Sequence, residues 1–288
     1  MSSQITSKSE LNTYSVLMSV YAADSPEYLE AAVRSMLNQS VIPDDFVLVE
    51  DGPVSKELDR VAERMRKIGH ENNVDFKIVR LSRNCGLGIA LDEGIKNCRN
   101  NLIARMDADD IAMPDRCEKE LRCFMEQPDL DIVSGAIAEF EKDPNNVRAI
   151  RYVPLDQENI VKQMHIRSPF NHPAVMYKKS SVVLAGGYGN SVRKEDHDLF
   201  SRMLFGEKAR AMNIPDVILK YRAGQNNIKR RKSLKNIASY FEIMKINRKR
   251  GYVSWRDCLI VYLSQVIYFI LPERMLDFVI RKFLRKAV

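Results

Sequence analysis

Short apolar runs alternate with amphipathic segments over the first part of the chain. The runs are rich in β-branched and aromatic residues, which predicts strands at 14–21, 46–50, 76–81 and 102–106. Apolar residues at helical spacing predict helices that begin near 26, 55 and 89, the first after a Ser25-Pro26 start signal. This alternation indicates right-handed βαβ units and a mostly parallel, Rossmann-like α/β sheet flanked by helices.

The same pattern continues beyond residue 113 with longer polar breaks. Helices are predicted at 114–127 and 156–166, and strands at 131–140, 147–153 and 174–177. A further helix begins in the acidic stretch 194–198 and runs to about 204. We therefore predict one α/β domain over 1–221, divided into halves at about 14–113 and 114–221.

Three carboxylates, Asp107, Asp109 and Asp110, follow the apolar run 102–106 and have no packing reason to be there. The ligand crevice of an open α/β sheet lies at the carboxyl ends of its strands, where Asp51 and Asn84 also fall. A divalent cation held by one or two carboxylates keeps positions free for phosphate oxygens. The pattern favours a nucleotide-diphosphate substrate. These residues alone leave open an acidic turn before the helix near Pro114.

Composition narrows the cellular setting and the kind of site. Residues 1–12 are polar and form no secretory signal, and the five cysteines include no Cys-x-x-Cys pair, so we expect a reducing cytoplasm. Two nucleotide-binding motifs are excluded. Gly86-x-Gly88 has Leu91 where a dinucleotide fingerprint needs its third glycine, and no P-loop sequence occurs.

Basic charge is concentrated in the segment 222–288. This segment carries 16 Lys and Arg against 4 Asp and Glu, whereas 1–221 carries 29 against 34. It holds a nearly uncharged run at 258–271, shorter than the roughly 20 residues that span a bilayer, and a basic amphipathic pattern at 275–286. We predict a helical appendage that attaches to an anionic membrane surface. The alternative is that these helices pack back on the rest of the chain.

Six segments together resemble the bacterial family 2 glycosyltransferases of GT-A fold that build O-antigen, capsular and exopolysaccharide repeat units. In chain order they are 15–21 (Ser-Val-Leu-Met-Ser-Val-Tyr), 49–53 (Val-Glu-Asp-Gly-Pro), 84–94 (Asn-Cys-Gly-Leu-Gly-Ile-Ala-Leu-Asp-Glu-Gly), 105–110 (Arg-Met-Asp-Ala-Asp-Asp), 186–188 (Gly-Gly-Tyr) and 195–199 (Glu-Asp-His-Asp-Leu). Two positions depart from the family pattern: Asp92 stands where asparagine is usual, and His197 where an aromatic residue is common.

The resemblance implies transfer of a hexose from a nucleotide donor, most often a UDP-sugar, with inversion at the anomeric carbon. Asp107 and Asp109 match the family's Asp-x-Asp motif, which holds the ribose and a Mn²⁺ or Mg²⁺ ion that bridges the diphosphate. Asp51 is similar to the acid that contacts the nucleobase. The first half is thus the nucleotide-sugar half. Besides that motif, the residues expected to line its donor pocket are Tyr21, Ala22, Asp24, Glu27, Asp51, Arg83, Asn84, Gly86 and Ala108.

Inversion needs a base on the face opposite the leaving group, which the second, acceptor half would supply. Asp196 matches that residue of the family's Glu-Asp pair, with Glu195 and Asp198 as supporting acids and second choices for the base. His172, in a loop and followed by a proline, is a further candidate metal ligand, although most such histidines are structural.

We therefore expect an inverting, metal-dependent transferase that acts on a lipid-linked (undecaprenyl-diphosphate) saccharide. It would lie at the cytoplasmic face of a bacterial inner membrane, attached through 222–288, and would bind no nucleic acid. The nearest alternative is a transferase that acts on bare polyprenyl phosphate. A sugar nucleotidyltransferase is less favoured, because no basic glycine-rich loop near the amino terminus is present to hold a triphosphate. A non-catalytic protein that binds nucleic acid or membrane through its basic tail is the alternative of another class.

Overall fold

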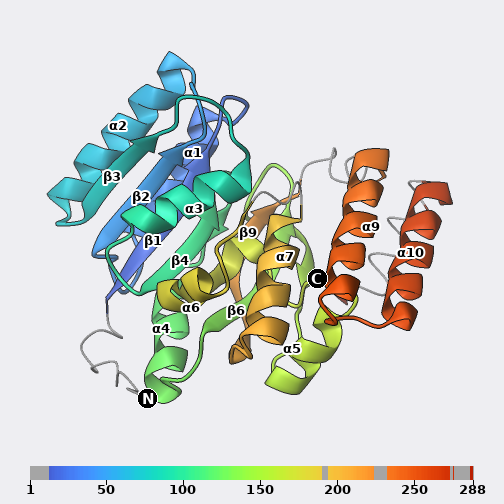
Figure 1. The fold of residues 1–288 in the computed structure, drawn as a ribbon. Helices are drawn as coiled ribbons and strands as arrows, with labels where there is room; N and C mark the ends of the chain where they lie inside the picture. Colours follow the sequence, from blue (N-terminus) through green and yellow to red (C-terminus); the bar gives the residue numbers. More distant parts are fainter. Residues whose placement is uncertain (1–12, 190–193, 224–231, 273–274, 276–285, 288) are drawn as a thin grey trace.

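A computed structural model describes residues 13–189, 194–223, 232–272, 275 and 286–287, and one mixed sheet runs through it (Figure 1). The strand order is β10-β7-β6-β8-β4-β1-β2-β3, with β9 paired to β6 and β5 paired to β9. The strands are β1 Tyr14–Val20, β2 Asp45–Glu50, β3 Asp75–Arg80, β4 Leu102–Asp107, β5 Ile111–Ala112, β6 Ile132–Phe140, β7 Val147–Arg151, β8 Val175–Lys178, β9 Ala211–Arg222 and β10 Lys286–Ala287.

The helices begin where the sequence carries capping signals. The side chains of Ser25 and Ser55 accept backbone N–H groups in the first turns of α1 and α2. The helices are α1 Pro26–Leu37, α2 Lys56–Glu71, α3 Leu87–Asn97, α4 Arg116–Glu126, α5 Gln157–Met164, α6 Lys179–Leu184, α7 Glu195–Ser201, α9 Leu234–Lys249 and α10 Trp255–Ile270. A π-helical turn, Arg202–Gly206, continues α7.

Two apolar cores cover opposite faces of the sheet, because alternate strand residues point to opposite sides. Tyr14, Val16 and Met18 of β1 pack in the core that contains α1, α2 and α4. Leu17, on the other face, packs in the core that contains α3, α5 and α7. The result is a three-layer α/β/α arrangement, with α3 and the pair α1 and α2 on opposite faces (Figure 1).

The strands β3, β2, β1 and β4 are parallel, so their carboxyl ends meet at one edge of the sheet. Beyond β4 the direction reverses, since β8 is antiparallel to β4 and β6 is antiparallel to β8. The predicted α/β fold is confirmed, with a parallel first half and a mixed second half. The sequence pattern had assigned no element to β5, α6 or β9.

The helices α9 and α10 lie side by side, with α9 between α10 and α7 (Figure 1). They share a small core of Met244, Val253, Cys258 and Val261. Among the described residues, no helix combines the length and apolar character needed to cross a membrane.

The helix predicted at 275–286 falls mostly outside the described residues. At its last residue the prediction is wrong, because Lys286 pairs with Ile150 as part of β10. This pairing satisfies backbone groups along β7, which a helix there would leave unpaired.

Candidate active site

The ends of β2 and β3 are tied together by Asp51. Its buried carboxylate accepts the N–H of Cys85 through Oδ1 at 2.6 Å and the N–H of Gly86 through Oδ2 at 3.0 Å. Gly52 has a φ of +86°, and a Cβ there would lie 2.4 Å from the backbone nitrogen of Asn84, so only glycine allows this approach. The structure thus brings Asp51 to the loop that carries Arg83, Asn84 and Gly86. A carboxylate with two accepted bonds still has lone pairs for a nucleobase.

The loop after β1 contributes Asp24 to the same edge. The backbone N–H of Tyr21 donates to Oδ2 of Asp24 at 2.9 Å, while the side chain of Tyr21 and residue Ala22 are exposed. Burial and the charge of Asp107 raise the pKa of Asp24 to about 6, which places Asp24 beside the acids after β4. Glu27 is also exposed, and the hydroxyl of Ser25 donates to its carboxylate at the start of α1.

Asp107, Asp109 and Asp110 form a cluster whose carboxylate oxygens lie within 4.8 Å of one another. Ala108 is buried between the first two. Burial, with the charges of Asp107 and Asp24, raises the pKa of Asp109 to about 6, and burial raises the pKa of Asp110. Oδ2 of Asp110 is buried without a hydrogen-bond partner. A bound divalent cation would offset the repulsion among these carboxylates and the cost of burying their negative charge. These residues therefore fit the Mn²⁺ or Mg²⁺ ion that the family resemblance implies.

Two arginines hold this cluster. The buried guanidinium of Arg105 pairs with the carboxylate of Asp107. The backbone N–H of Arg222 donates to Oδ1 of Asp110 at 2.8 Å, and its Nε donates to the carbonyl of Asp109 at 2.9 Å. The guanidinium of Arg222 also lies 3.8 Å from the centre of the Tyr28 ring. Sequence reasoning missed Arg222 as a site residue, since only its place at the end of the apolar run 217–222 marks it.

The first turn of α7 carries the other acids. Burial and the neighbouring charge of Asp196 raise the pKa of Glu195 to about 7. Burial is the largest single effect and favours the protonated form of Asp196, but His172, Lys194 and His197 together outweigh it, so the pKa of Asp196 lies below its ordinary value. Two neighbouring acids with pKa values moved apart are the arrangement that separates a base from a proton-bearing neighbour.

Asp198 lies in a different environment from the two acids before it. Its Oδ2 accepts Nε of Arg202 at 3.1 Å, and its Oδ1 accepts Nη1 of Arg250 at 2.5 Å. The carboxylate is buried and both of its oxygens are engaged, one with Arg202 in the turn that continues α7 and the other with Arg250 at the end of α9. This position suits an anchor better than a base.

His172 lies between the two groups of acids. Its Nε2 is 2.9 Å from the hydroxyl of Tyr188. Burial and the charge of Arg105 lower the pKa of His172 to about 3, against the pull of Asp196 and Asp107, so the ring is neutral at pH 7. Among the described residues, the possible metal ligands that lie close enough to share one ion are the three aspartates. His172 is not among them. His172 therefore lies near both groups of acids but outside that cluster, and its role as a metal ligand stays a prediction.

Asp92, in α3, binds the backbone of a second loop, which leads to α7. Its two carboxylate oxygens accept the backbone N–H groups of Tyr188 at 2.7 Å and Gly189 at 2.9 Å. A Cβ on Gly88 would lie 2.7 Å from the carbonyl oxygen of Gly189 and 3.3 Å from the Cβ of Glu195. The start of α3, beside the donor loop, thus packs directly against the start of α7.

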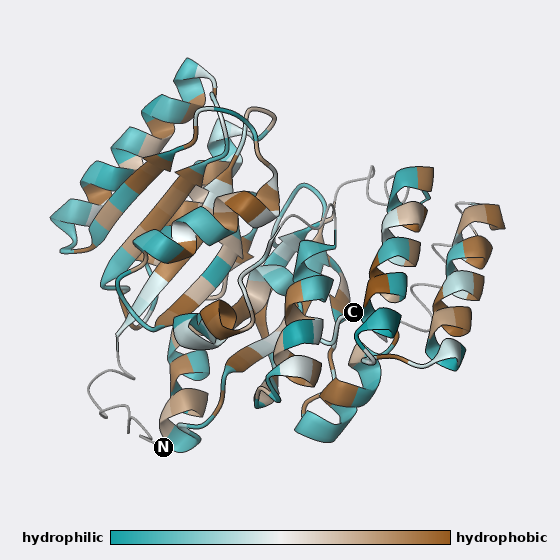
Figure 2. Ribbon diagram, viewed as in Figure 1, coloured by the Kyte–Doolittle hydropathy of each residue, from teal (hydrophilic) through white to brown (hydrophobic). Residues whose placement is uncertain are grey.

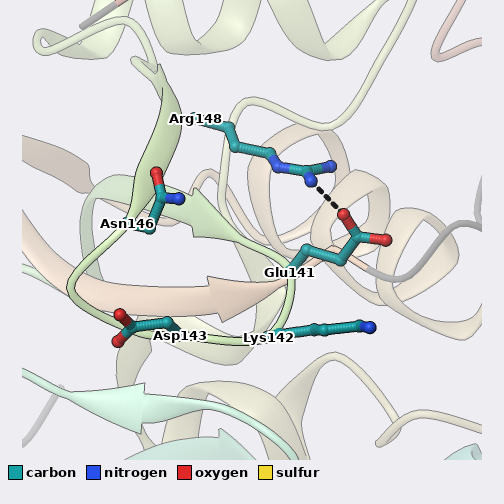
Figure 3. Close-up of a pocket in the computed structure, with 5 residues that line it drawn as sticks. All are labelled: Glu141, Lys142, Asp143, Asn146 and Arg148. Carbon is teal, nitrogen blue, oxygen red and sulfur yellow. Dashed lines mark ion pairs between the residues drawn. The ribbon is translucent and has the colours of Figure 1, made fainter.

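A separate cavity of about 350 Å³ lies at the turn between β6 and β7 (Figure 3). Its lining residues are Glu141, Lys142, Asp143, Asn146 and Arg148, with an ion pair between Glu141 and Arg148. None of the predicted site residues lines it. Its connection to the acids is through Arg222, whose Nη1 lies 3.5 Å from the carbonyl oxygen of Lys142.

Known proteins resemble this chain along most of its length. The sequence profile of the family described as "Glycosyl transferase family 2" matches residues 15–237. An Escherichia coli protein named UDP-Gal:alpha-D-GlcNAc-diphosphoundecaprenol beta-1,3-galactosyltransferase is 33% identical over 95% of this chain and 97% of its own. The amylovoran biosynthesis glycosyltransferase AmsE of Erwinia amylovora is 32% identical over 93% of this chain and 98% of its own.

Solved structures share the fold at low sequence identity. The mannosyltransferase PcManGT from Pyrobaculum calidifontis, in complex with GDP-Man and Mn²⁺, superposes with a TM-score of 0.61 at 14% identity, over 93% of this chain and 81% of its own. S. aureus TarS in complex with UDP-GlcNAc gives a TM-score of 0.59 at 13% identity, over 94% of this chain and 71% of its own.

Proposed function

The chain belongs to glycosyl transferase family 2, and from this membership we propose an inverting, metal-dependent transfer of a hexose from a UDP-sugar to a lipid-linked saccharide. The observation that carries the proposal is the contact at the start of α3, where the N–H of Gly86 donates to Asp51 at 3.0 Å and a Cβ on Gly88 would lie 3.3 Å from the Cβ of Glu195. The acid after strand β2 and the acids of helix α7, distant in sequence, thus lie on either side of one helix start. A leaving diphosphate and an attacking hydroxyl need such an arrangement.

The names of relatives support the substrate classes. The E. coli relative is named for UDP-Gal as donor and for a GlcNAc-diphosphoundecaprenol acceptor, and its similarity extends over nearly the whole of both chains. The Erwinia relative is named for the biosynthesis of amylovoran. We accordingly assign the chain to the assembly of a bacterial surface polysaccharide on a lipid carrier.

Asp107 and Asp109 would hold the Mn²⁺ or Mg²⁺ ion, with Asp110 buried behind them. The cation, when bound, supplies charge stabilisation to the departing UDP as a Lewis acid. Asp51 and the loop 83–86 orient the nucleoside, while Arg222 and Arg105 keep the two metal-binding acids in place. Asp196 takes the proton from the acceptor hydroxyl as it attacks. Glu195 modulates that base, because its pKa of about 7 allows its charge to change near neutral pH.

The tail supports attachment to a membrane surface. Helix α10 is largely apolar along its length (Figure 2). One side of it holds Leu259, Leu263, Ile267 and Ile270, each more than half exposed. Exposed lysines and arginines lie nearby, among them Lys235, Lys245, Lys249 and Arg256. An apolar face beside basic side chains suits the surface of an anionic leaflet better than nucleic acid, which offers no apolar layer. We propose peripheral attachment at the cytoplasmic face of the inner membrane.

The test is transfer by the purified full-length protein. The protein is incubated with Mn²⁺, a panel of UDP-sugars and a GlcNAc-diphosphate lipid. We expect UDP release and a product one hexose larger, with the opposite anomeric configuration to the donor. Pyrophosphate release would instead identify a nucleotidyltransferase. Charging of bare polyprenyl phosphate, with the saccharide lipid ignored, would identify the other transferase class. No turnover of any UDP-sugar would refute the proposal.

A further inference from the structure

Helix α9 contacts both ends of α7, the helix that carries the acids Glu195 and Asp196. At the start of α7, Nζ of Lys194 donates to Oδ1 of Asn236 at 3.1 Å and lies 3.7 Å from the centre of the Tyr240 ring. At its end, the buried amide of Asn247 donates to the hydroxyl of Ser201 at 2.9 Å. Residues 236–247 of the basic tail therefore follow α7 along its length.

The strongest of these contacts is the ion pair between Arg250 and Asp198. Arg250 ends α9, and its Nη1 donates to Oδ1 of Asp198 at 2.5 Å. Asp198 is buried, so its charge depends on Arg202 and Arg250 for compensation. Removing Arg250 would leave the buried carboxylate of Asp198 with Arg202 as its remaining ion-pair partner, and a buried charge that loses part of its compensation is costly.

Arg202, the second ion-pair partner of Asp198, is also hydrogen-bonded to the loop that contacts the donor half. Nη2 of Arg202 donates to the carbonyl of Gly187 at 2.6 Å. The next two residues of that loop donate their N–H groups to Asp92 of α3. A continuous path therefore runs from α9 through Asp198 and Arg202 to the helix that follows the donor loop.

We propose that α9 is part of the catalytic unit and that Arg250 is a positioning residue, which holds α7 and its two acids through Asp198. The proposal rests on the function proposed above, because it assigns the tail a second role beside membrane attachment. The family profile ends at residue 237, only four residues into α9, so Arg250 lies outside the segment that the profile describes. Lys194, which α9 also holds, lies next to Glu195 and sets part of the charge around Asp196.

The experiment compares Arg250→Met with Lys249→Met in the full-length protein. Both variants remove one positive charge from an exposed residue at the end of α9, but only Arg250→Met removes the ion pair with Asp198. Amide hydrogen exchange over 195–201 is measured first, since it needs no substrate. We expect faster exchange in Arg250→Met than in wild type or Lys249→Met, and partial restoration in Arg250→Lys. Equal exchange in the two methionine variants would overturn the proposal.

Kinetics provide the second readout, with a short-chain, water-soluble acceptor so that membrane binding plays no part. We expect Arg250→Met to lower kcat about tenfold, with the KM for the UDP-sugar within about twofold of wild type. Lys249→Met should match wild type in both. An equal loss in the two variants would show that the charge of the tail matters rather than the ion pair. If wild type is inactive, the proposed function fails, while the exchange data still decide the role of Arg250.

Discussion

Asp92 of α3 accepts the backbone N–H of Tyr188 at 2.7 Å, across 96 positions of the chain. Its second oxygen accepts the N–H of Gly189, so one carboxylate closes the contact between the donor half and the loop before α7. An asparagine side chain has one carbonyl oxygen and would present N–H groups to the second donor. Compared with an asparagine, the aspartate at position 92 therefore makes one more hydrogen bond at this junction.

The first prediction concerns the stability of this junction. Asp92→Ala leaves two N–H groups without their charged acceptor, and we expect the free energy of unfolding to fall by about 2 kcal/mol or more. Asp92→Asn should lose about half as much, because it keeps one bond. Urea unfolding measures both variants. Glu93→Gln is the control, since Glu93 is paired at the surface with Lys96, a contact of small worth. A stability of Asp92→Asn equal to or above wild type would contradict the interpretation.

The sequence predicted most of the first half of the fold, because its signals are local. Strands β1 to β4 are short runs rich in apolar, β-branched and aromatic residues, and Ser25 and Ser55 cap the helices that follow β1 and β2. Acids placed after parallel strands were expected at one edge, and the hydrogen bonds of Asp51 to the loop at 85–86 connect two of those strand ends.

Strand β9 was missed for a physical reason. Pro215 and Asp216 are exposed in its middle, and the pairing with β6 shifts between Gly135 and Ala136 to accommodate them. A proline and an acid inside a run of apolar residues break the strand pattern on which the prediction depends. The bulge can be identified only when the partner strand is known, because it is defined by the pairing of the two strands. Arg222, at the end of β9, was missed with it.

The role of Asp198 could not be predicted from the sequence for a similar reason. Its charge is compensated by Arg250, 52 positions away, and no periodicity links the two residues. Three acids at the start of one helix look alike in sequence, and only their surroundings assign one to an ion pair and two to the centre near His172.

The second prediction tests the base. Asp196→Asn removes the proton acceptor but keeps the shape of the side chain, and we expect kcat to fall by about two orders of magnitude or more. UDP binding in the presence of Mn²⁺, measured by thermal shift, should stay close to wild type. Full activity in this variant would transfer the role to Glu195.

The third prediction is a pH dependence set by Glu195. Because burial and Asp196 raise the pKa of Glu195 to about 7, Glu195 is protonated below that pH and ionised above it. Its negative charge makes Asp196 a stronger base, so we expect kcat to rise as the pH increases through about 7. Glu195→Gln should remove this limb and leave a flatter profile. A limb at the same pH in Glu195→Gln would assign the titration to another group.

The fourth prediction concerns the cation. With EDTA, UDP should no longer raise the melting temperature, and added Mn²⁺ should restore the effect, because the diphosphate binds through the ion. Asp109→Asn removes one ligand and should weaken the Mn²⁺-dependent shift by about tenfold in concentration. Asp115→Asn is the matched control, since Asp115 is paired with Lys119 at the start of α4. A UDP shift that persists in EDTA would exclude a metal-bridged diphosphate.

The last prediction separates membrane attachment from catalysis. Replacing Leu263 and Ile267 with serine removes two exposed apolar side chains from one face of α10, worth about 2–4 kcal/mol of transfer free energy. The affinity for anionic vesicles, measured by sedimentation, should fall at least tenfold, because a tenfold change corresponds to about 1.4 kcal/mol, which is less than this loss. Val183 and Leu184 of α6 are somewhat more exposed than these two residues, so their replacement by serine is the control. Activity on a short-chain acceptor should be unchanged in both double variants, because neither touches α7 or the acids. Equal vesicle binding by the two double variants would show that α10 is not the surface that meets the lipid.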